Sequence, residues 1–109
     1  MNVLLINGSP HKNGCTYTAL SEVAKTLSEC NVESEIVHIG SQPVRGCIGC
    51  GKCKDSHLCV YDDVVNEIIR KAEKADGFVI GTPVYYASAN GSLVSLLDRL
   101  FSAGNAFAF

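Results

Sequence analysis

The sequence predicts an α/β fold, a doubly wound parallel sheet with helices on both faces in three layers. Short apolar runs alternate with amphipathic stretches along the 109 residues, in the order strand, helix, strand, long loop, helix, strand, helix. This alternation is typical of parallel strands joined by helical crossovers. The loops after the first and third strands should then lie at one edge of the sheet, where ligands bind in such folds.

The first half of the chain predicts a strand, a helix and a second strand. Residues 3–6 are continuously apolar and end at Asn7-Gly8, which favours a strand covered on both faces. A helix is expected to begin near Thr16. Its apolar residues recur at helical spacing: Leu20, Val23, Ala24 and Leu27. The strand expected at 32–39 is half polar and therefore suits the edge of the sheet.

The second half predicts a long loop, two helices and a buried strand. Residues 40–59 have no hydrophobic period and are rich in Gly, Cys and Pro, as functional loops are. Asp62 or Asp63 can cap the next helix. Its buried stripe consists of Val64, Val65, Ile68, Ile69 and Ala72. A buried strand is expected at 77–81, a loop at 82–90, and then a last helix. The helical spacing there comes from Leu93, Leu96, Leu97, Leu100 and Phe101.

The predicted strand order, 2-1-3, leaves the most apolar strand at an open edge. Such an edge is an aggregation hazard. The sequence also ends in an apolar segment, 104–109. We therefore expect that further C-terminal strands are missing from this chain, or that a partner chain covers the edge.

Composition excludes several classes of protein. Hydrophobic residues make up 47% of the chain and charged residues 18%, so it can bury a core. The net charge of −2 argues against a nucleic-acid partner. No apolar run approaches the roughly 20 residues that span a bilayer, which argues against a membrane partner. The N-terminus resembles a strand rather than a signal peptide, so the expected compartment is the cytoplasm.

The loop after the first strand has the features of a phosphate site. Residues 8–16 contain two glycines and lead into a helix, whose free N–H groups attract anions. The hydroxyls of Ser9 and Thr16 can donate to phosphate oxygens, and Lys12 or His11 adds positive charge. Alternatively, the glycines only form a turn and Thr16 only caps the helix.

The loop after the third strand offers a flat aromatic surface. Pro83 stiffens the backbone, and Tyr85 and Tyr86 follow it. A flat ring such as isoalloxazine could stack there. In the alternative interpretation, Tyr85 packs under the sheet and Tyr86 merely faces solvent.

Together these motifs resemble the NAD(P)H-dependent FMN reductase superfamily, whose fold is flavodoxin-like. The resemblance rests on Gly-Ser-Pro-x-x-x-Gly-x-Thr, Thr-Pro-Val-Tyr-Tyr and Leu-Leu-Asp-Arg, and it runs along the whole chain. It implies one FMN-binding domain over residues 1–109, the N-terminal part of a family domain. The implied phosphate residues are Ser9, His11, Asn13, Gly14, Cys15 and Thr16. The implied ring and ribityl residues are Thr82, Pro83, Val84, Tyr85 and Tyr86.

A compact cysteine loop, 46–59, is the second informative feature. Four of the six cysteines fall there: Cys47, Cys50, Cys53 and Cys59. Two-residue spacers let thiolates converge on one centre, and a compact four-cysteine motif favours an iron–sulfur cluster over zinc. The motif resembles the iron–sulfur flavoprotein branch of the superfamily, which implies a [4Fe–4S] cluster and a dimer or tetramer. Zinc, or structural thiols without any metal, remain the alternatives.

The expected function is an FMN-dependent oxidoreductase that moves electrons between NAD(P)H, or a protein donor, and a small acceptor or redox protein. No side chain stands out as a catalytic acid or base, because the flavin carries the chemistry. Two other functions stay open: a non-enzymatic electron carrier, and a metal-binding structural module. Asp98 and Arg99 could form an ion pair on the helix surface, although the resemblance favours a structural role for Arg99.

Overall fold

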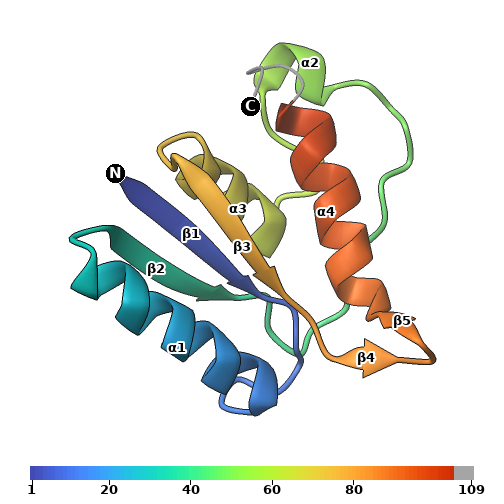
Figure 1. The fold of residues 1–109 in the computed structure, drawn as a ribbon. Coiled ribbons are helices and arrows are strands. Elements are labelled where there is room, and N and C mark those ends of the chain that lie inside the picture. Colours follow the sequence, from blue (N-terminus) through green and yellow to red (C-terminus); the bar gives the residue numbers. More distant parts are fainter. Residues whose placement is uncertain (105–109) are drawn as a thin grey trace.

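A computed structural model, which describes residues 1–104, has a three-stranded parallel sheet at its centre (Figure 1). Strand β1 (Asn2–Asn7) lies between β2 (Glu33–His38) and β3 (Gly77–Gly81), and both pairings are parallel. The strand order β2-β1-β3 is the predicted one, with the half-polar strand at an edge. The flavodoxin-like α/β class expected from the sequence is therefore confirmed.

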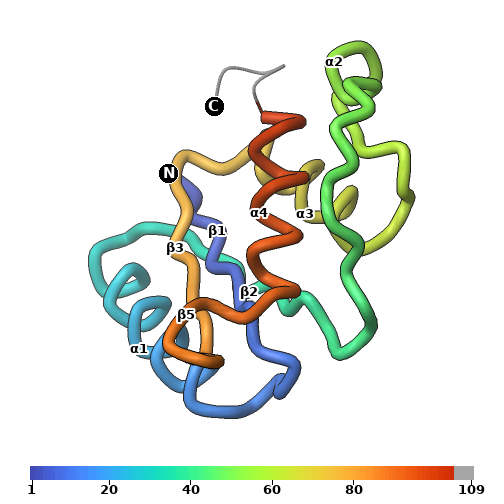
Figure 2. The backbone as a smooth tube through the Cα atoms, turned by 90° about the vertical axis from the view of Figure 1, so that its right-hand side faces the viewer, coloured from blue at the N-terminus to red at the C-terminus, as the bar shows by residue number. Residues whose placement is uncertain are grey.

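Helices cover both faces of this sheet, as predicted. Helix α1 (Cys15–Glu29) lies on one side, and α3 (Val64–Ala72) and α4 (Gly91–Gly104) lie on the other (Figure 2). Asp63 begins α3, because its side chain accepts a hydrogen bond from the backbone N–H of Val65 at 3.1 Å. One of the two capping residues suggested by the sequence therefore has that role.

The core forms where the central strand meets the helices. Leu4 and Ile6 of β1 belong to a buried cluster with the apolar stripes of α3 and α4. Leu5, which lies between these two residues in the sequence, is also fully buried. It points to the opposite face of the sheet because side chains alternate along a strand. A strand buried on both faces explains the unbroken apolar run at residues 3–6.

Strand β3 departs from the prediction of a buried strand. It is only partly buried, and Ile80 is 38% exposed. Among the described residues β3 pairs with β1 alone, so its other edge is open, as the strand order implies. Most of the apolar segment at the end of the sequence, 105–109, lies outside the described residues.

Three short elements were not predicted. Helix α2 (Cys53–Ser56) lies inside the segment expected to be an irregular loop, and a hairpin of β4 (Val84–Tyr85) and β5 (Ser88–Ala89) lies inside 82–90. The hairpin turn places Tyr86 and Ala87 in the left-handed region. Elements of two to four residues are too short to show a hydrophobic period.

No helix within residues 1–104 is long and apolar enough to cross a membrane.

Candidate functional site

Three loops are tied together at the carboxyl edge of the sheet. The N–H of Gly8, after β1, donates to the carbonyl of Gly81, after β3, at 2.8 Å. The side-chain amide of Asn90 donates to the carbonyl of Gly8 at 2.6 Å. From β2, Nε2 of His38 lies 2.7 Å from the carbonyl oxygen of Ser9. The predicted phosphate loop is thus held from both neighbouring strands.

Asn7 shapes that loop from within. Its side chain is fully buried; Oδ1 accepts from the N–H of Ser9 at 3.0 Å, and Nδ2 donates to the carbonyl of Lys12 at 3.3 Å. The N–H of His11 then donates to Oγ of Ser9 at 3.1 Å. Ser9 is itself buried, so its hydroxyl supports the loop from inside.

The start of α1 is open to an anion. Its capping residue, Gly14, offers no side chain, no side-chain hydrogen bond caps the first N–H groups, and the first turn holds no acidic residue. Backbone N–H groups at such a helix start attract negative charge. His11, Lys12 and Cys15 are exposed around it. This geometry, with exposed Asn13 and half-buried Thr16 beside it, fits a phosphate group.

The hairpin after β3 presents its aromatic side chains to solvent. Tyr86 is fully exposed and Tyr85 is 46% exposed, so Tyr85 does not pack under the sheet. Val84 is also exposed, at 76%, while Pro83 is half-buried. Thr82 anchors the base of the hairpin, because its Oγ1 accepts from the N–H of Asn90 at 3.2 Å.

A pocket of about 280 Å³ connects these loops. It is lined by Pro10 of the phosphate loop, Tyr85 of the hairpin and the start of α4 at 90–92, together with residues 39–42 after β2. The structure therefore brings the two predicted groups of FMN residues to one edge of the sheet. An anion site next to exposed apolar and aromatic surface suits a phosphorylated flat ligand.

The four cysteines of the 46–59 loop line one small pocket. This pocket, of about 30 Å³, is completed by Tyr61, Arg99 and other residues. Cys47 and Cys50 are exposed, whereas Cys53 and Cys59 are half-buried. Within residues 1–104, no three metal-ligating side chains are already arranged to hold an ion. Thiolates are the ligand type of an iron–sulfur cluster, and the four cysteines line the same pocket, so the residues present fit such a group in kind.

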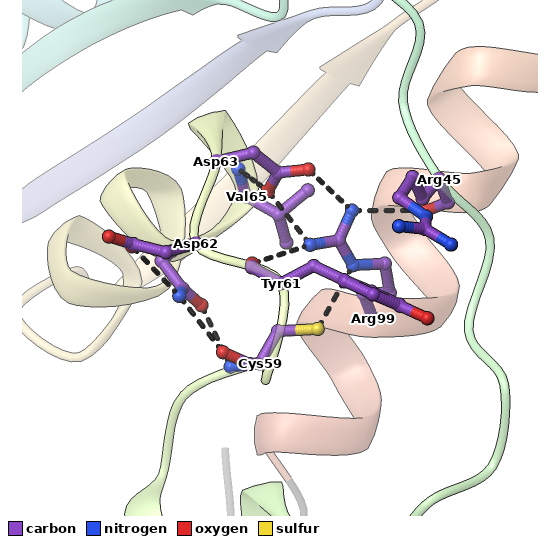
Figure 3. A network of polar contacts seen from close by, with 8 residues as sticks. Arg45, Cys59, Tyr61, Asp62, Asp63, Val65 and Arg99 are labelled. Atoms are coloured by element: carbon purple, nitrogen blue, oxygen red, sulfur yellow. Dashed lines mark hydrogen bonds and ion pairs between the residues drawn. The ribbon is translucent and has the colours of Figure 1, made fainter.

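Arg99 is the best-connected polar side chain beside this loop (Figure 3). It is 2% exposed. Nη1 and Nη2 form a bidentate pair with the carboxylate of Asp63 at 2.9 and 2.8 Å. They also donate to the carbonyls of Arg45 and Tyr61, at 3.0 and 2.9 Å, and Nε donates to Sγ of Cys59 at 3.2 Å. All five donors of the guanidinium are therefore used.

The expectation of a surface ion pair between Asp98 and Arg99 is wrong. Arg99 is buried and pairs with Asp63, which is distant in the sequence. Burial opposes its charge, but hydrogen bonds and charge attraction from Asp63 and Cys59 outweigh burial, so the pKa of Arg99 is raised. The structural role that the sequence suggested for Arg99 agrees with this network. Its attachment to the cysteine loop could not be read from the sequence.

The two candidate sites lie at different ends of α4. The hairpin immediately precedes that helix, whereas α2, which belongs to the cysteine loop, lies beside its far end (Figure 1). The cysteine pocket is lined by Arg99 and Ser102 of the same helix. At roughly 1.5 Å per residue, Gly91 and Arg99 are about 12 Å apart along the helix axis. A flavin site and a metal site on this chain would thus be built from separate residues.

Comparison with known proteins places these features in context. The model of one protein family, described as NADPH-dependent FMN reductase, matches residues 1–109. The fold also matches a solved flavone reductase with a TM-score of 0.69 at 23% identity, over 91% of this chain and 29% of that one. At that identity the likeness concerns the fold alone.

Known proteins similar to this chain include iron–sulfur flavoproteins and an FMN-dependent azoreductase. An iron–sulfur flavoprotein from Methanocaldococcus jannaschii is 35% identical over 91% of this chain and 51% of its own. Another, from Methanosarcina thermophila, is 33% identical over 91% and 52%. An FMN-dependent NADPH-azoreductase from Staphylococcus saprophyticus is 35% identical over 92% and 52%. The chain spans about half the length of these relatives.

Proposed function

The chain belongs to the NADPH-dependent FMN reductase family, and on that premise we propose that it binds FMN at the carboxyl edge of its sheet. Electrons would pass from NAD(P)H, or a protein donor, to a small acceptor or redox protein. The observation that carries this proposal is the uncapped start of α1 beside the exposed aromatic hairpin. The NADPH-azoreductase among its relatives supports a reductase rather than a passive carrier.

Two groups of residues would hold the cofactor. The phosphate would lie at the start of α1, within reach of the backbone of 9–16 and of the hydroxyl of Thr16. The flat ring would rest on the hairpin, against Val84, Tyr85 and Tyr86, with Thr82 and Pro83 at its base. Ser9 and Gly14 act through the shape of the loop, since Ser9 is buried and Gly14 leaves the helix start open.

When bound, a flavin supplies hydride and one-electron chemistry of its own. The side chains of this chain would bind and orient it and keep water from one face of the ring. We assign no catalytic acid or base.

We further propose that Cys47, Cys50, Cys53 and Cys59 hold a [4Fe–4S] cluster. The names of several relatives and the shared pocket support this ligand set. Four thiolates from a compact motif are the usual ligands of such a cluster. We also propose a dimer or tetramer in the cytoplasm.

The flavin site is tested by comparing FMN with riboflavin, which lacks the phosphate. We expect the chain to bind FMN at least about tenfold tighter, equivalent to about 1.4 kcal/mol from the phosphate. Thr16→Ala should weaken FMN binding and leave riboflavin binding unchanged. Equal affinity for both ligands would contradict the phosphate assignment. Steady oxidation of NAD(P)H by the FMN-loaded chain with a quinone would separate the reductase from an electron carrier.

A further inference from the structure

The four cysteines differ in how firmly the fold holds them. Cys47 and Cys50 lie in an exposed segment with Gly49 and Gly51, both of which have positive φ. The only hydrogen bonds recorded for Cys47 among the described residues are a weak 4.0 Å contact with the hydroxyl of Ser102 and one from the N–H of Gly49 at 3.4 Å. Among the described residues these two sulfur atoms are therefore exposed and weakly held.

Cys59 is fixed through both its backbone and its sulfur. Asn66, a buried residue of α3, accepts from the N–H of Cys59 at 2.8 Å and donates to its carbonyl at 3.0 Å. Nε of Arg99 donates to the sulfur at 3.2 Å. Helices α3 and α4 therefore both hold this cysteine.

Arg99 also fixes the two ends of the cysteine loop. Its Nη atoms donate to the carbonyl of Arg45, just before the loop, and to that of Tyr61, just after it. The guanidinium of Arg45 lies over the ring of Tyr61, 3.8 Å from its centre, and closes the base of the loop from outside. One planar side chain thus sets the position of Cys59 relative to the segment that carries the other three cysteines.

We propose that Arg99 is the positioning residue of the four-sulfur site: it fixes Cys59 as the first ligand, around which Cys47, Cys50 and Cys53 close. This inference rests on the metal site proposed above. The fork of five donors is required, because it contacts one sulfur, two carbonyls and one carboxylate at once. A lysine, with a single ammonium group, cannot make these contacts together.

The test counts sulfur ligands on metal-free chain titrated with Co²⁺ alone. The intensity of the sulfur-to-cobalt absorption increases with the number of bound thiolates, and so reports ligation independently of enzyme activity. Wild type should bind through four sulfurs. Arg99→Gln and Arg99→Lys should each lose about a quarter of this intensity per bound ion, as when one thiolate of four is lost. Cys59→Ser should give the same loss.

Asp63→Asn is the matched control for a general loss of stability. It removes the charge that pairs with Arg99, but the amide oxygen can still accept from Nη2 and from the N–H of Val65. We expect this variant to unfold at lower denaturant than wild type and to keep four sulfur ligands. If stability alone decides ligation, Asp63→Asn will lose a ligand as well, which overturns the proposal.

The remaining outcomes are distinguishable. Four sulfurs in Arg99→Lys or Arg99→Gln would overturn the role of Arg99 and leave the metal site intact. If wild type binds FMN but takes Co²⁺ through fewer than four sulfurs, the inference fails, whereas the proposed flavin function stands. If Arg99→Gln does not fold, the number of sulfur ligands in Arg99→Lys, which keeps the buried charge, tests the role of Arg99.

Discussion

At the scale of single residues, the phosphate loop depends on a side chain outside the motif. Asn7 is fully buried at the end of β1 and bonds two backbone groups of the loop, at Ser9 and Lys12. Replacing it with alanine leaves both groups without that partner. The loop should then lose the shape that presents the start of α1 to an anion.

We therefore predict that Asn7→Ala lowers the free energy of unfolding by about 1–3 kcal/mol, the cost of leaving buried hydrogen-bonding groups unpaired. The same variant should weaken FMN binding. Urea unfolding of the flavin-free chain measures the first effect. Asn13→Ala, at an exposed position of the same loop, should change stability by less than about 0.5 kcal/mol. Equal stability of the two variants would show that Asn7 does not hold the loop.

Roles of this kind, in which one side chain holds a loop through tertiary contacts, are the hardest to predict from the sequence. Asn7, Asn90 and Arg99 act through partners that are distant in the sequence or belong to the backbone. No spacing rule records such contacts. The motif residues of the phosphate loop and hairpin could be predicted because a glycine-rich turn between a strand and a helix is a local pattern.

At the scale of elements, strand β3 packs tightly against α1 at its C-terminal end and has free space around its N-terminal end. A Cβ added to Gly81 would lie 2.9 Å from Cγ2 of Thr16 and 3.1 Å from the side chain of Leu20, both on α1. A Cβ on Gly77, at the other end of the strand, would meet nothing within 4 Å. Neither glycine has positive φ, so the two positions differ in space and not in backbone strain.

Gly81→Ala should therefore destabilise the chain by about 1–3 kcal/mol, as overpacking does. Gly77→Ala should be neutral or stabilise it by up to about 1 kcal/mol, because alanine restricts the unfolded chain. Thermal unfolding of both variants, compared with wild type, measures the difference. A lower Tm for Gly77→Ala than for Gly81→Ala would contradict the packing of α1 on this strand.

The strands and long helices could be predicted because each spans enough residues to show its hydrophobic period. The same rule explains the errors. Helix α2 and the hairpin strands contain only two to four residues each, and their turns rest on individual backbone conformations such as those of Tyr86 and Ala87. The partial exposure of β3 could not be predicted either. The apolar residues of a strand show that it can be buried, but they do not show which neighbouring elements cover it.

At the scale of the whole molecule, the separation of the two sites along α4 predicts that they can be lost independently. Cys50 is exposed and belongs to the cysteine pocket. Cys50→Ser should abolish most of the bound iron and change the Kd for FMN by no more than about twofold, as expected for distant sites. Isothermal titration and iron analysis check this.

Cys30→Ser is the matched control, since Cys30 is exposed but lies outside the pocket. It should leave both iron and FMN binding unchanged. A large loss of FMN affinity in Cys50→Ser alone would mean that the two sites share structure in a way that the positions along α4 do not suggest.

The central claim, that one chain carries both a flavin and an iron–sulfur site, is tested most directly by the visible spectrum of protein purified without oxygen, with iron and sulfide analysis. We predict flavin absorption bands over a broad shoulder, and iron and sulfide in equal amounts. Flavin bands without iron would leave an FMN protein with structural cysteines. A colourless protein that takes up neither FMN nor iron would contradict the account.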